Sequence, residues 1–161
     1  LFRGSSEGRI RQALIKENLL DAVIGLPAGL FQTTGIPVAI LIFDKSRQAG
    51  GKNQDRKDIL FIDASRDYIS RKKQNTLSDD HIEKILTTYR ERKETEKYSH
   101  IAQPEEISEN DYNLNIPRYV NTFEAEEEVD LPAVKAEIER IEAELTEVQE
   151  RMDGYLKELG L

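Results

Sequence analysis

Three short apolar runs limit most strongly what this chain can fold into. They are DAVIGLP at residues 21–27, VAILIFDK at residues 38–45 and DILFIDA at residues 58–64. Short apolar runs of this kind with charged ends are typical of strands buried on both faces. The connection between the first two runs is too short for a crossover helix, so these two strands should pair antiparallel.

Helices are predicted on either side of these strands. The first follows GSSEG, where Ser5 or Ser6 can cap it by accepting from a free main-chain N–H group. The second starts at Ser78, where acidic residues 79 and 80 favour the positive end of the helix dipole, and it should fade near Lys93.

Two segments lack such periodicity. Residues 46–57 are rich in Gly and Lys and are expected to form a mobile loop. Residues 101–123 contain several Asn and Pro and are expected to be extended and rich in turns. Apolar anchors in the second segment should attach it to the sheet: Tyr112, Leu114, Ile116, Tyr119 and Val120.

The end of the chain carries an apolar repeat with a mean spacing of 3.5 residues, which indicates a coiled-coil or bundle helix. At ~1.5 Å per residue such a helix is roughly 40 Å long, too long to bury its narrow seam on a small sheet. We expect it to bind a partner helix, although a helix lying on its own domain is the alternative. The seam residues are Leu131, Val134, Ile138, Ile141, Leu145, Val148, Met152, Tyr155 and Leu159. The predicted organisation is therefore an α/β part at residues 1–100, an extended segment with an acidic linker at 101–130, and a helix at 131–161.

Charge is distributed unevenly along the chain. Residues 1–100 carry 18 Lys and Arg against 14 Asp and Glu, a net charge of +4, whereas residues 101–161 carry 5 against 17, a net charge of −12. The first part could contact phosphates, and the acidic part should contact protein. A non-catalytic DNA-binding protein is therefore disfavoured.

Composition excludes several kinds of site. The chain has no Cys and only two His, His81 and His100, so neither a disulfide framework nor a zinc site is expected. No apolar run reaches the roughly 20 residues of a membrane span, so no membrane contact and a cytoplasmic location are expected. We find no phosphate-binding loop and no catalytic triad. The residues alone predict a small α/β unit with an interaction helix, and no reaction.

Four strings, taken together and in order, resemble one family. They are LFRG…EGRIRQALIKENLLDAVIGLPAGLF, TGIPVAILIFDK, ILFIDAS and NDYNLNIPRYV. The chain resembles the C-terminal part of the modification subunit of type I restriction–modification systems, an N6-adenine DNA methyltransferase. The resemblance covers residues 1–120, and the acidic tail matches the family in character more than in sequence.

The resemblance implies a fold and a division of the active site. The intact subunit would have a Rossmann-like sheet that uses S-adenosylmethionine, and residues 21–27 and 38–45 would be its last, antiparallel strands. The family's catalytic tetrapeptide, Asn/Asp-Pro-Pro-Tyr/Phe, does not occur here, nor does its Gly-rich cofactor loop. We therefore expect this chain alone to bind no cofactor and to be inactive.

The resemblance also suggests site residues. Enzymes of this motif order carry an aromatic ring between their last two strands, where it stacks on the adenine flipped out of the duplex, and Phe31 occupies that position. Phe31 could instead be a core aromatic. Thr33, Thr34 and Gly35 would shape the turn or contact the DNA backbone. Further candidates for backbone contacts, each with a structural or solvated alternative, are Arg71, Lys72, Lys73 and Arg118.

The resemblance implies partners as well. The modification subunit works with a specificity subunit and a restriction subunit, on DNA. The tail helix would dock on the specificity subunit, or could pair with a copy of itself. The alternative is a stand-alone interaction module with a small α/β head and a coiled-coil tail.

Overall fold

The protein is described from a computed structural model. The compact unit that carries the fold runs Leu1–Phe123, and a second unit, Glu124–Leu161, is treated by itself. The description covers residues 1 and 3–122 and, in the second unit, positions 135, 138, 140–142, 144–146, 148, 149, 151, 152 and 156.

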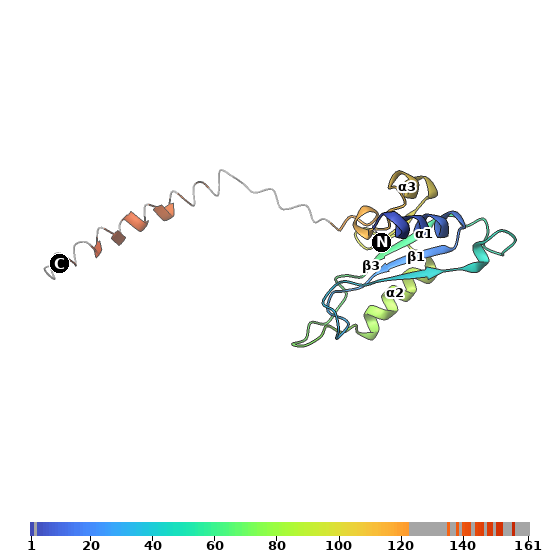
Figure 1. The fold of residues 1–161 in the computed structure, drawn as a ribbon. Helices are drawn as coiled ribbons and strands as arrows, with labels where there is room; N and C mark the ends of the chain where they lie inside the picture. Colours follow the sequence, from blue (N-terminus) through green and yellow to red (C-terminus); the bar gives the residue numbers. More distant parts are fainter. Residues whose placement is uncertain are drawn as a thin grey trace. The chain divides into compact units, whose positions relative to one another are not determined.

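The first unit is a four-stranded mixed sheet with helices on both faces (Figure 1). The strand order is β2-β1-β3-β4, in which β1 pairs antiparallel with β2 and parallel with β3, and β3 pairs antiparallel with β4. The expected α/β class and the expected antiparallel first pair are both confirmed. The elements in chain order are α1 (Ser5–Lys16), β1 (Leu20–Gly25), β2 (Ala39–Phe43), η1 (Lys45–Arg47), β3 (Ile59–Asp63), α2 (Asp79–Glu91), β4 (Ser99–Ala102), α3 (Pro104–Glu109) and η2 (Ile116–Arg118).

The sheet separates two apolar cores because side chains alternate along each strand. On one face Val23 and Phe61 pack against residues 114–120, and the ring of Tyr119 stacks on that of Phe61 with centroids 3.9 Å apart. On the other face alternate residues of β1 and β3 pack against α2. The expected anchoring of residues 112–120 to the sheet is therefore observed.

Residues 112–114 also hold the start of the chain. The guanidinium Nε of Arg11 donates to the carbonyl of Tyr112 (2.7 Å), and the main-chain N–H of Leu114 donates to the carbonyl of Leu1 (3.1 Å). Helix α1 buries none of its own residues. These hydrogen bonds and the partly buried Ile15, which packs against the core, hold this part of the chain on the sheet.

One predicted strand differs in its surroundings. β1 and β3 are buried as expected, but β2 is an edge strand in the described part of the chain, and Ile40, Leu41 and Phe43 are 46%, 39% and 47% exposed. The prediction that β2 is buried on both faces was wrong for this chain. An apolar run shows that a strand needs cover, but it does not show what provides it.

Local predictions had mixed outcomes. Ser78 caps α2 by accepting from the N–H of His81 (3.3 Å), as expected. The predicted cap of the first helix was wrong, because Gly4 is the N-cap and no side chain caps it. The segment expected to be extended contains the end of β4 and the helix α3, where Pro104 takes the first helical position. Proline is favoured there because its missing N–H would have no helical partner.

A buried cluster of charges closes the end of the sheet where β1 and β3 begin. The Asp21 carboxylate is 3% exposed and accepts from Arg47 (2.6 Å), from Arg92 (3.0 Å) and from the hydroxyl of Tyr89 (2.8 Å). Burial, followed by the hydrogen bond to Asp21, raises the pKa of Tyr89. A buried carboxylate is tolerated because it is paired and hydrogen-bonded.

Arg47 is the centre of this cluster. Its guanidinium is fully buried and also donates to the side-chain oxygen of Asn18 (3.0 Å) and to the carbonyl of Asp58 (2.7 Å). The start of the predicted mobile loop is therefore tied into the fold, and the expectation of a mobile loop was wrong at this end. Lysine and arginine in a Gly-rich segment predict exposure. Arg47 is the exception because it forms a buried ion pair with Asp21.

Candidate nucleic-acid interface

The loop between β1 and β2 presents an exposed aromatic ring. Its base is closed by the hydrogen bond from the N–H of Leu26 to the carbonyl of Val38 (2.8 Å). At its far end a tight turn joins Phe31 and Thr34, where the N–H of Thr34 donates to the carbonyl of Phe31 (3.2 Å). The hydroxyl of Thr34 then accepts from the N–H of Ile36 (3.1 Å).

Phe31 itself is 49% exposed and belongs to neither apolar core. Among the described residues, Phe31 is therefore not part of an apolar core. The neighbouring Thr33 and Gly35 are exposed as well, so the whole turn is open to a ligand. A half-exposed ring at the end of an ordered turn can stack on a planar partner such as a nucleobase.

A second loop, between β3 and α2, carries the predicted basic residues. Ile69 and Thr76 exchange main-chain hydrogen bonds (2.8 and 3.1 Å) and close this loop like a small hairpin. Arg71, Lys72 and Lys73 lie between them and are all exposed. We call residues 71–73 the basic tip.

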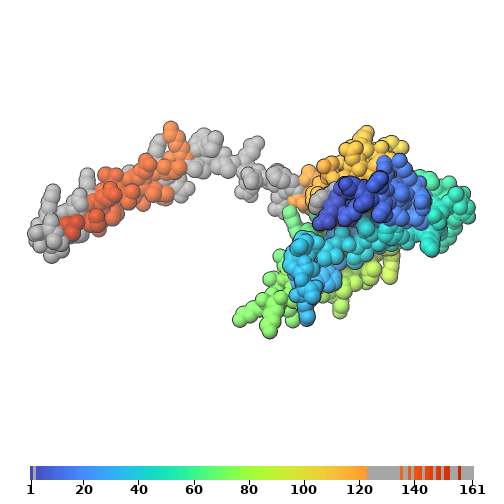
Figure 2. Space-filling view, viewed as in Figure 1, coloured from blue at the N-terminus to red at the C-terminus, as the bar shows by residue number. Residues whose placement is uncertain are grey.

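The two loops are fastened to each other by hydrogen bonds. The side-chain amide of Asn75 donates to the carbonyl of Ala28 (2.9 Å), and its main-chain N–H donates to the carbonyl of Gly29 (2.9 Å). The side-chain amide of Gln74 donates to the carbonyl of Leu30. We call these three hydrogen bonds the clamp. Figure 2 shows the two segments side by side, residues 28–36 in blue and residues 69–76 in green.

The backbone at Gly29 makes room for the clamp. Gly29 has a φ of +69°, in the left-handed region that favours glycine, and a Cβ at this position would lie 3.3 Å from the side-chain nitrogen of Asn75. The loops that carry Phe31 and Arg71, about forty positions apart in the sequence, are thus joined to each other.

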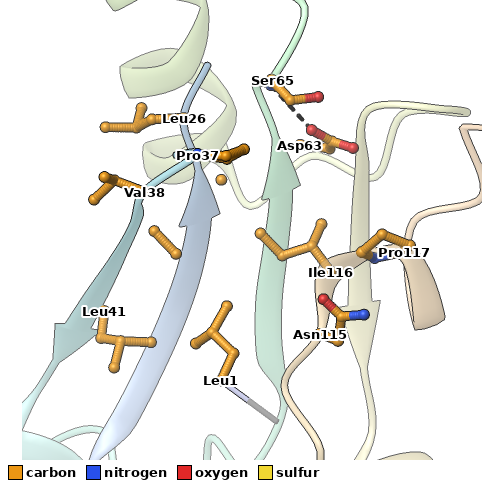
Figure 3. Close-up of a pocket in the computed structure, with 12 residues that line it drawn as sticks. Leu1, Leu26, Pro37, Val38, Leu41, Asp63, Ser65, Asn115, Ile116 and Pro117 are labelled. Carbon is orange, nitrogen blue, oxygen red and sulfur yellow. Dashed lines mark hydrogen bonds between the residues drawn. The ribbon is translucent and has the colours of Figure 1, made fainter. Parts of the chain in front are cut away.

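A hollow of about 670 Å³ lies at the carboxyl ends of β1 and β3 (Figure 3). Apolar side chains such as Val38, Leu41 and Ile116 line most of it. Its one carboxylate, Asp63, accepts from the N–H of Ser65 (2.9 Å), which caps the end of β3. The hollow therefore offers mainly apolar surface.

Other site types find no support in the part of the chain that the structure describes. No group of three or more His, Asp or Glu side chains is arranged to hold a metal ion among these residues. Across the same residues, no helix combines the length and apolar character needed to cross a bilayer. The candidate site is therefore the surface formed by the two loops.

Comparison with known proteins identifies the family. The family model described as N-6 DNA methylase matches residues 1–128. The chain belongs to the N-6 DNA methylase family. The resemblance to modification subunits found in the sequence is thereby confirmed.

Individual relatives of this methylase family are subunits of type I restriction enzymes. The MjaVIII methylase subunit of Methanocaldococcus jannaschii is 41% identical and the MpnII methylase subunit of Mycoplasma pneumoniae is 33% identical, each over 99% of this chain. In both cases the match covers 28% of the relative. The chain thus spans little more than a quarter of the length of these methylase subunits.

Solved structures agree with the fold. A type I restriction–modification methyltransferase subunit from Streptococcus thermophilus is 51% identical with a TM-score of 0.70, over 76% of this chain and 25% of that one. A structure described as showing complex assembly and conformational transition of a type I restriction–modification system covers 98% of this chain and 34% of that one, with a TM-score of 0.53 and 21% identity. The second likeness concerns the fold alone.

Not every predicted site residue of this methylase chain joins the two loops. Arg118 lies in η2, where its guanidinium donates to the side-chain oxygen of Asn110 (3.3 Å). In the tail, the described seam residues have helical backbone and are about half exposed: Ile138, Ile141, Leu145, Val148 and Met152. The remaining seam residues, Leu131, Val134, Tyr155 and Leu159, lie outside the described residues.

Sequence reasoning missed the residues of the clamp. Gln74 and Asn75 directly follow the basic tip, and their type and position gave no signal because Gln and Asn are common in loops. Gly29 gave no signal either. The need for a glycine at this position depends on its contact with Asn75, which is far away in the sequence.

Proposed function

We propose that this chain is the C-terminal part of the modification subunit of a type I restriction–modification system, which methylates adenine N6 in DNA with S-adenosylmethionine. The observation that carries the proposal is an exposed aromatic turn, fastened beside a basic tip, in a chain of the N-6 DNA methylase family. Sites in α/β sheets form at the carboxyl ends of parallel strands, and both loops leave from the carboxyl ends of β1 and β3.

In this proposal the sheet continues beyond β2. β1 and β2 are the last strands of a Rossmann-like sheet, and the rest of the subunit covers the exposed edge with its Ile40, Leu41 and Phe43 side chains. An uncovered apolar edge is a liability in a finished protein. Cofactor binding and the catalytic tetrapeptide then belong to the rest of the subunit, so this chain alone is inactive.

Phe31 has the role of holding the target base. Extruding an adenine from the duplex costs a few kcal/mol of stacking, and a ring in the enzyme pocket offsets part of that cost. The basic tip neutralises phosphates next to the extruded base, with Thr33, Thr34 and Gly35 shaping the turn between them. Arg118 is hydrogen-bonded to Asn110 rather than to either loop and would contact a neighbouring subunit or phosphate.

Replacing Phe31 with Ala in the full-length subunit tests this role. Stacking on an aromatic side chain is worth about 1–3 kcal/mol per base, so methylation should fall about 5- to 150-fold. The fold should be unchanged because the ring belongs to neither core. The measurement is single-turnover methylation of a cognate duplex by the assembled complex, and an unchanged rate would remove Phe31 from the base pocket.

The tail is proposed to dock on the specificity subunit through its apolar seam. The net charge of −12 on residues 101–161 suits a protein partner and opposes DNA. Deleting residues 131–161 should abolish co-purification with the specificity subunit, while the Phe31→Ala subunit co-purifies normally. A truncated subunit that still assembled with its specificity subunit would contradict the docking role. Alternatively, the seam could pair with the tail of a second copy of this chain. The restriction subunit would join the same complex.

The comparisons give no support to the alternative of a stand-alone interaction module. The match runs along 99% of this chain within methylase subunits that are more than three times longer.

A further inference from the structure

The clamp joins the two loops at the residues next to their functional groups. Its donors, Gln74 and Asn75, directly follow the basic tip. Its acceptors are the carbonyls of the three residues that directly precede Phe31. Each loop is therefore held a residue or two from the side chains that it presents, and neither loop can shift without pulling on the other.

Asn75 makes the larger share of this connection. It donates twice, once from its side chain to Ala28 and once from its main chain to Gly29, and its side chain is part-buried against the left-handed turn at Gly29. Both acceptors are uncharged carbonyls, so salt leaves these bonds intact while it weakens the contacts of the exposed basic tip. The strength of the connection should therefore depend little on the salt concentration that tunes the tip's contacts with phosphate.

We propose that Asn75 is a positioning residue that couples phosphate contact at the basic tip to the orientation of Phe31 against the extruded base. This inference rests on the function proposed above. Three adjacent cations neutralise phosphates and release counterions, which fixes the tip on the DNA backbone. Through Asn75 the same event fixes residues 28–31, so that the ring is oriented before the base arrives. Orientation set in advance lowers the entropic cost of reaching a reactive geometry.

The sharpest test replaces Asn75 with Asp in the full-length subunit. Asp keeps the shape of the side chain but replaces its donor with an oxygen that faces the Ala28 carbonyl. We expect kcat for methylation, measured at saturating duplex, to fall about tenfold because orientation is lost. The new carboxylate beside the basic tip should also raise the KM for DNA by repelling phosphate, so kcat is the readout that reports orientation. A duplex with 2-aminopurine at the target position should show a smaller fluorescence change on binding.

Two further variants make the result specific. Asn110→Asp removes a comparable hydrogen bond, from the Asn110 amide to the carbonyl of Glu106 (3.0 Å), at the C-cap of α3. It keeps the oxygen that accepts from Arg118 and should leave kcat unchanged. Gln74→Glu removes the other side-chain donor of the clamp and should lower kcat in the same direction as Asn75→Asp. Hydrogen exchange in residues 28–34 should accelerate in both clamp variants and stay unchanged in Asn110→Asp.

A double variant shows whether Asn75 acts through the ring. If it does, adding Asn75→Asp to Phe31→Ala should cause little further loss of kcat, because both changes remove one shared effect. Additive losses, or a kcat of Asn75→Asp equal to that of Asn110→Asp, would overturn the coupling. Normal methylation by Phe31→Ala alone would instead reject the proposed base pocket, and the two failures are thereby distinguished.

Discussion

The two ends of the parallel pair β1 and β3 are fastened in opposite ways. At the end where the strands begin, Asp21, Arg47 and Arg92 are ionic partners inside the protein. At the end where the strands finish, neutral hydrogen bonds from Asn75 hold two loops together and leave Phe31 exposed. The first end uses its charges for the fold, whereas the second keeps its charges and its aromatic ring free for a ligand.

This difference separates stability from binding along one short pair of strands. Charges that are buried and satisfied by partners have no capacity left for phosphate, and removing one of them leaves the others unpaired. Exposed charges at the basic tip contribute little to folding but much to attraction of a polyanion. Variants at the two ends should therefore affect different measurements.

The largest effect should come from Arg47→Met. Methionine retains volume but leaves Asp21, the Asn18 oxygen and the Asp58 carbonyl without this donor, and breaking a buried pair typically costs about 3–5 kcal/mol. The loss should appear in the free energy of unfolding of β1 and β3, measured by native-state hydrogen exchange. Arg71→Met at the exposed tip is the matched control and should stay within about 0.5 kcal/mol. Equal losses in the two variants would erase the contrast between the two ends.

A smaller effect, on binding alone, should follow from replacing Arg71, Lys72 and Lys73 together with Gln. The slope of log affinity against log salt is negative, and each lost phosphate contact reduces its magnitude by about 1. Its magnitude should therefore fall by up to about 3. Fluorescence anisotropy with a labelled duplex over a series of salt concentrations measures this slope. Protection of β1 and β3 from exchange should not change. A slope equal to that of the unaltered subunit would mean that the tip does not contact DNA.

The smallest effect concerns His100 on β4, away from both ends. Its Nδ1 lies 2.5 Å from a carboxylate oxygen of Glu94 and its Nε2 lies 2.9 Å from one of Glu106. Burial alone would lower the pKa of His100, but the hydrogen bonds and charges of Glu106 and then Glu94 outweigh it and raise the pKa. With both ring nitrogens facing carboxylates, the charged imidazolium is the favoured form.

A raised pKa gives this histidine a defined pH dependence. Its contribution to stability is fully present below the unfolded pKa of about 6.5 and is lost as pH rises through the folded pKa. Because the ring is part-exposed, the change should stay below about 1 kcal/mol. Exchange of the β4 amides, corrected for intrinsic rates, should show the loss as pH rises above about 6.5, and Glu106→Gln should reduce it. A stability that rises over this range would contradict the assignment.

Much of the fold could be predicted because it rests on local patterns. Apolar runs marked β1, β2 and β3, and the Ser-Asp-Asp start marked α2. The exposure of β2 could not be predicted, since burial on the far side of a strand depends on a neighbour that sequence periodicity does not identify. β4 is only four residues long and begins where the predicted helix had faded, so it gave no periodic signal.

The candidate site divides in the same way. Phe31 and the basic tip were chosen one by one, the ring from a family resemblance and the tip from its charge. Their adjacency could not be foreseen, because it depends on hydrogen bonds between residues 74–75 and main-chain carbonyls at 28–30, which carry no residue-type signal. Arg47 shows the converse error, as a cation in a Gly-rich loop proved to be buried.

The contacts of residues 112–120 with the N-terminal residues and with β3 have a consequence for protein synthesis. One face of Phe61 is covered by Tyr119, and the carbonyl of Leu1 accepts a hydrogen bond from the N–H of Leu114. A growing polypeptide that has reached only residue 100 therefore already contains β1, β2 and β3 but still presents one apolar side of them to water. Such intermediates are prone to aggregate. A chain released from the ribosome before residue 120 has been added should thus expose this apolar surface to chaperones and proteases.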